Sequence, residues 1–172
     1  MQTQDALIQA LKTVRPVAWD QLPDLNLYKD QVLSYMQRQV LSFDEEDALT
    51  SAMINNYIKA GLLPRAEGKK YSRQHIACLT AACVLKQVLS VGNAERLMHE
   101  ETRQGIEPFY EKYLSVLDEA LASTAKTLEQ APEDSLSDLA LRLAISSYAQ
   151  RLACMELLKH LTPDAPEPRH GK

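Results

Sequence analysis

The chain has 172 residues, 45% of them hydrophobic and 24% charged, and its net charge is −4. This composition is typical of a soluble globular protein, and it excludes a membrane span because no run of about 18 uncharged apolar residues occurs. The N-terminal segment lacks a basic region followed by an apolar core, so no secretory signal is expected. Three cysteines, an odd number lying in helical patterns, favour reduced thiols, and we expect a cytoplasmic protein.

The first third of the chain predicts two helices joined by a connector. Apolar residues at helical spacing favour one helix over residues 3–14 and another over 27–41, with Asn26 as the N-cap of the second. Trp19 lies in the connector, and we expect it to pack against the body of the protein. The acidic run at 44–47 lacks the glycine and the alternating oxygens of a calcium loop, so it is interpreted as a solvated turn.

The middle of the chain predicts a short helix, a turn and a longer helix. Thr50 or Ser51 caps a helix that ends at Gly61, a residue suited to the left-handed conformation that closes helices. A turn follows at 65–71, and its composition fits a small β-hairpin with a glycine at the tip. A longer helix then starts at Ser72.

The second half of the chain predicts three more helices, over residues 94–103, 107–129 and 135–161. Pro132 separates the last two, so they are expected to form an antiparallel hairpin. The tail after residue 161 holds three prolines and no apolar face, and we expect it to be disordered.

Positive charge is concentrated between residues 51 and 90. Six cations and one acidic residue lie in this segment, which gives it +5 and leaves −9 for the rest of the chain, since the total is −4. A local phosphate-binding face on an acidic body produces this asymmetry, and a basic solvated surface is the simpler alternative. The cations are Lys59, Arg65, Lys69, Lys70, Arg73 and Lys86, and the acid is Glu67.

The sequence LTSAMINNYIKAGLLP at 49–64 resembles the second helix of MerR-type winged helix-turn-helix domains. The shared pattern is an aromatic residue, here Tyr57, followed by a short polar turn and Gly-Leu-Leu-Pro. The segment GKKYSRQHI, which begins at Gly68, is similar to the wing and the start of the next helix. The whole of 49–90, with LYKDQV upstream, also resembles a bacterial family catalogued only as a domain of unknown function and thought to have such a fold.

This resemblance implies a recognition helix over 51–60 and a basic wing at 65–73 that bind double-stranded DNA. The side chains agree, because asparagine makes two hydrogen bonds to the adenine edge in the major groove and cations beside a glycine turn hold phosphates. An exposed polar face under little constraint remains the simpler explanation of the asparagine pair. The expected DNA-binding residues are Ser51, Ala52, Asn55, Asn56, Lys59, Arg65, Lys69, Lys70 and Arg73.

Three features depart from the MerR pattern. About 45 residues precede the module, the link at 42–48 is long and acidic, and two C-terminal helices replace the single helix that pairs MerR dimers. These departures argue against promoter twisting as the mechanism and leave DNA binding as the expectation.

No motif of catalysis or of cofactor binding occurs in the sequence. His99-Glu100-Glu101 lacks the second histidine of a helical zinc site, and His75 with Cys78 makes only half of a site. A phosphate loop, a nucleophile elbow and a dinucleotide fingerprint are all missing. We therefore expect no enzymatic activity, no cofactor and no metal site.

The predicted fold is all-α: a MerR-like winged helix-turn-helix with a small β-wing, followed by a C-terminal antiparallel helical hairpin. The predicted function is a DNA-binding transcriptional regulator that acts as a homodimer through the apolar stripe of residues 136–161. Two alternatives stay open. One is a protein-interaction module that has the winged fold without DNA binding. The other is a sensor whose small-molecule effector lies between the last two helices, among Tyr110, Tyr113 and Tyr148 with Phe109. The expected parts are an N-terminal helix and connector at 1–26, the winged module at 27–104, the hairpin at 105–161 and the tail at 162–172.

Overall fold

The computed structural model describes residues 2–40, 48–131 and 136–161. Within these ranges the chain is mostly helical with one two-stranded antiparallel sheet, which confirms the helical character predicted from the sequence. The predicted acidic turn at 44–47 and the tail at 162–172 lie outside the described residues. None of the described helices is long and apolar enough to cross a membrane. The helices are α1 (Gln2–Thr13), α2 (Lys29–Met36), α3 (Ser51–Lys59), α4 (Arg73–Leu85), α5 (Val91–Glu101), α6 (Ile106–Glu129) and α7 (Leu136–Lys159), and the strands are β1 (Leu27–Tyr28) and β2 (Lys70–Tyr71).

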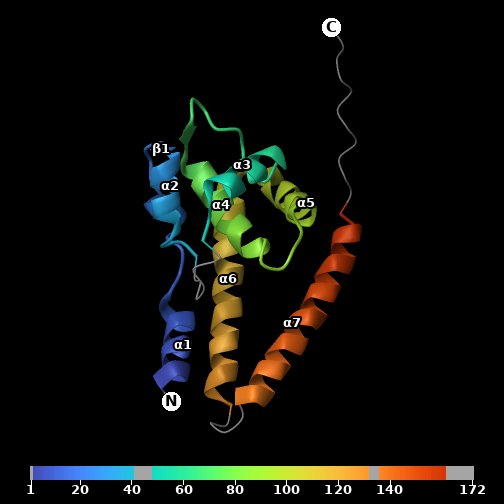
Figure 1. Ribbon diagram of the computed structural model, residues 1–172. Coiled ribbons are helices and arrows are strands. Elements are labelled where there is room, and N and C mark those ends of the chain that lie inside the picture. The colour runs from blue at the N-terminus through green and yellow to red at the C-terminus, as the bar shows by residue number, and fades with distance from the viewer. Residues whose placement is uncertain (1, 41–47, 132–135, 162–172) are drawn as a thin grey trace.

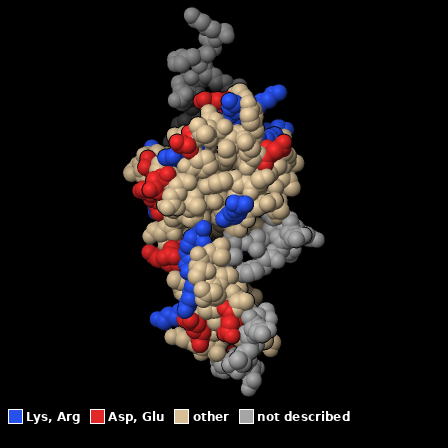
Figure 2. Space-filling view, turned by 90° about the vertical axis from the view of Figure 1, so that its left-hand side faces the viewer, with Lys and Arg blue, Asp and Glu red and all other residues tan. Residues whose placement is uncertain are grey.

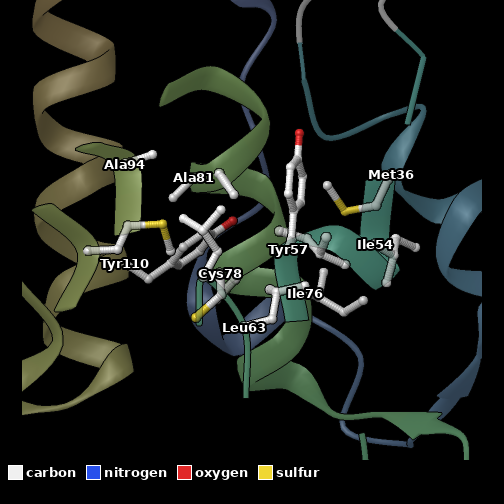
Figure 3. Packing of buried hydrophobic residues seen from close by; sticks show 14 of the residues in the cluster. Met36, Ile54, Tyr57, Leu63, Ile76, Cys78, Ala81, Ala94 and Tyr110 are labelled. Carbon is white, nitrogen blue, oxygen red and sulfur yellow. The ribbon is translucent and has the colours of Figure 1, made fainter. Parts of the chain in front are cut away.

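Helix α4 forms the centre of the main core. Every residue from His75 to Ala82 is buried, as expected for a helix that packs against neighbours on all sides. Side chains from α2, α3, α5 and α6 meet around it, among them Ile54 of α3 and Tyr110 of α6 (Figure 3). Alanines on α4 leave room for these neighbours to approach closely.

Helix α3 begins and ends at local features that the sequence carries. The Thr50 hydroxyl accepts a hydrogen bond from the backbone N–H of Met53 at 3.2 Å. At the other end Gly61 has a φ of 83°, and the backbone N–H of Leu62 donates to the carbonyl of Tyr57 at 2.9 Å. Together they make the Schellman closure, which needs a residue that adopts the left-handed conformation without strain. The predicted caps at both ends are confirmed.

A two-stranded sheet joins the start of α2 to the start of α4. Strand β1 pairs antiparallel with β2, with Tyr28 opposite Lys70. The prediction of helix over 27–28 is therefore wrong, because the Gln31 side chain accepts from the backbone N–H of Tyr28 at 2.8 Å and the helix starts only after the strand. Asn26 is consequently not the cap of α2.

The long helix α6 supports both α1 and α7. Helix α1 lies alongside the half of α6 that is lower in Figure 1, where Leu11 packs with Ala125 and Leu128 in a second, smaller core. Helix α7 runs back antiparallel to α6 but tilts away from it (Figure 1), in partial agreement with the predicted hairpin. It packs against the rest of the chain near its two ends, where Leu139 joins the second core and Leu158 joins the main core.

Candidate nucleic-acid interface

Helix α3 turns one polar face to solvent. Its opposite face buries Ile54 and Tyr57 in the main core, and the helical period then directs the positions between them outward. The five residues of this helix that were predicted to contact DNA all lie on the exposed face: Ser51, Ala52, Asn55, Asn56 and Lys59.

Lys29, the first residue of α2, lies beside the asparagine pair of α3. Its Nζ donates a hydrogen bond to Oδ1 of Asn55 at 2.8 Å, which joins the two helices across their exposed side. The contact orients the Asn55 amide and adds a cation to the face of α3. Sequence reasoning missed Lys29, because 26 residues separate it from Asn55 and no local pattern links the two.

A tight turn from Glu67 to Lys70 forms the tip of the segment between α3 and α4. The backbone N–H of Lys70 donates to the carbonyl of Glu67 at 3.0 Å, and the central residues Gly68 and Lys69 have φ values of 54° and 67°. Two successive left-handed residues are the pattern of a type I′ hairpin turn. Gly68 adopts this conformation freely, whereas the Cβ of Lys69 makes it strained. The predicted turn with Gly68 at its tip is confirmed, but the predicted β-hairpin is reduced to a single Glu67–Lys70 bridge, because β2 pairs with β1 instead.

The cations near this turn occupy two environments. Arg65, Lys69 and Lys70 are exposed and belong to the segment 65–70, called the basic turn from here on. Lys70 also makes a cation–π contact across the sheet, with its Nζ 5.3 Å from the centre of the Tyr28 ring. Arg73 is partly buried, and its Cζ lies 5.8 Å from the centre of the Trp19 ring in the connector. It is therefore held by the body of the protein, apart from the basic turn.

His75 fastens both ends of the basic turn to α4. Its Nδ1 accepts a hydrogen bond from the backbone N–H of Ser72 at 3.0 Å, so Nε2 carries the ring proton and donates to the carbonyl of Arg65 at 3.2 Å. The ring is 4% exposed, and Tyr71 packs edge-on against it. In the sequence, His75 and Cys78 have the spacing of only half a metal site. Among the described residues, no cluster of three or more metal-ligating side chains occurs. The geometry shows a clamp that positions the turn.

Charge on this side of the molecule is mixed. Figure 2, seen from the side of α1 and α2, shows Lys and Arg side chains toward its upper end, with Asp and Glu side chains among them. Asp30 beside Lys29 and Glu67 in the basic turn are both exposed acids close to the predicted contacts. The cations therefore do not form an unbroken positive face in this view.

The tyrosines of the second half do not converge on one site. Tyr110 is buried, with its hydroxyl donating to the Val17 carbonyl at 2.9 Å and its ring stacked 5.9 Å from that of Tyr113. Tyr148 is exposed on α7. Because Tyr110 is buried and Tyr148 is exposed, these two side chains do not line one enclosed site together.

The cysteines are free thiols, as the sequence predicted. Burial raises the pKa of the Cys78 thiol to about 12 and that of Cys83 to about 11. Both thiols are therefore protonated and poorly nucleophilic at neutral pH, which fits residues of the core.

Comparison with known proteins finds one family. The model of a domain of unknown function (DUF1836) matches residues 17–113, more than half of the chain, and the match includes α2, α3, the basic turn, both strands and α4. No curated protein and no solved structure shows a significant match to the chain.

Proposed function

Because the chain belongs to the DUF1836 family, whose function is undefined, we propose a role from its own side chains: it is a transcriptional regulator that binds double-stranded DNA through α3. The exposed face of α3 carries this proposal. Asn55 and Asn56 present amides between Ser51 and Lys59, and Lys29 is hydrogen-bonded to Asn55. Asparagine suits the adenine edge, and a helix with short side chains enters a major groove that is about 12 Å wide.

The elements around α3 support a winged helix-turn-helix. Helix α2 precedes α3, the basic turn follows it, and β2 leads into α4, which is the order implied by the resemblance to MerR-type domains. In such modules the second helix enters the groove and the wing contacts the neighbouring backbone. We accordingly assign Arg65, Lys69 and Lys70 to phosphates and Asn55 with Asn56 to base edges.

The strain at Lys69 favours a functional role for the basic turn. Glycine or asparagine is preferred at a left-handed turn position, and a lysine there costs about 1–2 kcal/mol. Among the described residues, the Lys69 ammonium has no hydrogen-bond or ion-pair partner that would offset this cost. A strained cation kept at an exposed tip is typical of a position that serves binding.

Fluorescence anisotropy tests the proposal, with labelled genomic fragments titrated against the full chain at several salt concentrations. We expect fragment-selective binding that weakens steeply with salt. Lys69→Ala/Lys70→Ala should lower the slope of log affinity against log salt by about 0.9 for each lost phosphate contact. Asn55→Ala/Asn56→Ala should lower the preference between fragments and leave the slope unchanged.

Lys126→Ala is the matched control, because Lys126 is an exposed lysine near the far end of α6 from the basic turn. It should leave affinity and slope as in the unmodified chain. Equal effects of Lys126→Ala and Lys69→Ala/Lys70→Ala would indicate nonspecific charge attraction. Absence of binding at moderate salt would reject DNA as the ligand.

A protein-interaction module is the second candidate, and the mixed charge in Figure 2 favours it. A surface with interspersed acids and cations suits a protein partner of mixed charge better than a phosphate backbone. Under this alternative the same α3 face and basic turn would bind protein, and the anisotropy titrations would show no saturable DNA binding.

A further inference from the structure

Helix α7 exposes a row of large apolar side chains. Leu141, Ile145, Tyr148 and Leu152 are 61%, 60%, 58% and 50% exposed, and the partly buried Met155 continues the row. Their spacing of four, three, four and three residues is the heptad pattern that lines one side of a helix. These five residues, called the α7 seam from here on, extend over about 21 Å.

The first four residues of the α7 seam point away from their own chain, whereas Met155 at its end packs partly against the main core and accepts a hydrogen bond from Asn93 at 3.4 Å. Leu139 and Leu143, which pack in the second core, lie on the opposite side of the helix from Leu141. In the middle of the helix, the residues that continue this inner side are polar: Ser146, Ser147 and Gln150. A helix whose only partner is its own chain carries the reverse pattern, with its apolar side inward.

We propose that the α7 seam binds the α7 seam of a second copy of the chain, antiparallel and centred on Tyr148. The row is nearly symmetrical about Tyr148: Leu141 and Met155 lie seven residues away on either side, and Ile145 and Leu152 lie three and four residues away. Reversing one copy therefore sets Leu141 against Met155 of the other and brings Ile145 next to Leu152. A surface that complements itself after a two-fold rotation is what a homodimer requires.

The charges beside the seam agree with this pairing. Arg142 and Glu156 lie on the same flank of the seam, six residues before and eight residues after Tyr148. In the antiparallel pair, Arg142 of each copy therefore faces Glu156 of the other copy. Their present partners are Asp138 and Lys159 on α7 itself, in exposed ion pairs of little energy that rearrange readily. Two Arg142–Glu156 pairs therefore frame the proposed interface.

A parallel pair is less well supplied with partners. It would bring Arg151 toward Glu156 of the second copy, but Arg151 Nε already donates to the carbonyl of Val88 at 2.9 Å. The same contact places the exposed Val88 beside the seam, where it adds apolar surface to the antiparallel interface.

The area available suits a modest dimer. Each strongly exposed seam residue offers roughly 100 Å² of apolar surface, so two copies with four such residues remove roughly 800 Å² from water. Val88 and the stems of the flanking charged residues bring the interface toward the approximately 1,200 Å² at the lower end of stable complexes. We therefore expect a dimer that dissociates at micromolar concentrations.

Sedimentation equilibrium of the full chain without DNA tests the pairing, so its outcome is independent of the proposed DNA binding. The unmodified chain should be a dimer at high micromolar concentration, and Ile145→Lys should raise the dissociation constant by at least about 100-fold. The milder Leu152→Ala should raise it about tenfold. Leu157→Lys is the matched control, because Leu157 is 70% exposed on the other side of α7, and it should leave the constant unchanged.

Circular dichroism should show the same helical content in all these variants, since every altered side chain is exposed. If the unmodified chain is a monomer, the proposal is overturned. This holds also if the chain is monomeric because the seam packs against α6 of its own chain. A dimer that Ile145→Lys and Leu157→Lys weaken equally would place the interface elsewhere.

Charge reversal tests the direction of pairing. Glu156→Arg should weaken the dimer about fivefold by setting like charges together, and Arg142→Glu/Glu156→Arg should restore it. If the double variant is weaker than the single one, antiparallel pairing about Tyr148 is wrong.

Discussion

Replacing Lys69 by glycine is expected to stabilise the fold and at the same time to weaken the proposed DNA contact. The φ of 67° at this exposed residue costs a lysine about 1–2 kcal/mol, and glycine removes that cost. Glycine also has greater conformational freedom in the unfolded chain, which lowers the free energy of unfolding by about 0.4–1 kcal/mol. The expected net increase in the free energy of unfolding is therefore about 0.5–1 kcal/mol. For a chain of this length, that corresponds to a rise in Tm of about 1–4 °C.

Lys69→Ala is the matched control for this substitution, because it removes the same charge and keeps the strained Cβ. Thermal unfolding followed by circular dichroism should show a higher Tm for Lys69→Gly alone, while both variants lower the salt slope of DNA binding by about 0.9. Equal stability of the two variants would refute the strain at Lys69. An unchanged slope in both would refute its phosphate contact.

Three further changes test other parts of the site. Gly61→Ala places a Cβ at a residue with φ 83°, where the new atom lies in ordinary contact 3.5 Å from the Glu95 Cγ. We therefore expect a loss of about 1 kcal/mol in the free energy of unfolding, caused by the backbone conformation and not by a clash. An unchanged urea midpoint would contradict this loss. His75→Ala removes the hydrogen-bond partner of the Ser72 backbone N–H and of the Arg65 carbonyl. It should lower the free energy of unfolding by about 2 kcal/mol and speed amide hydrogen exchange selectively at 65–72. A uniform increase of exchange along the chain would argue against the clamp. Cys78, with its thiol pKa raised to about 12, should resist iodoacetamide at pH 8 until the protein unfolds, and rapid labelling seen by mass spectrometry would contradict its burial.

Features made by neighbouring residues were predictable from the sequence. Thr50 and Gly61 set the two ends of α3 through hydrogen bonds that span three to five residues. Ser72 precedes α4, and its backbone N–H donates to the His75 side chain three residues later. Such contacts depend on the chemistry of a few adjacent positions, which a single sequence displays. The side of α3 that carries Asn55 and Asn56 followed equally from the helical period.

Contacts between distant residues were not predictable. Strands of two residues are too short to show an alternating pattern, so no pattern in the sequence predicts the pairing of Tyr28 with Lys70. The hydrogen bond from Lys29 to Asn55 likewise depends on the packing of α2 against α3. For α7 the sequence displayed an apolar stripe, but whether that stripe faces inward or outward is decided by the anchoring of Leu139 and Leu158.

The small sheet also sets the boundaries of any working fragment of this protein. Because Tyr28 and Lys70 are paired in the antiparallel sheet, the basic turn and the start of α2 should unfold locally as one cooperative unit. Their backbone amides should then show similar protection from hydrogen exchange. A truncated chain that starts at Lys29 would keep every side chain of the proposed contact face, yet its basic turn would lack a partner strand. The minimal fragment must therefore start upstream of Leu27, and the family match, which starts at residue 17, satisfies this requirement.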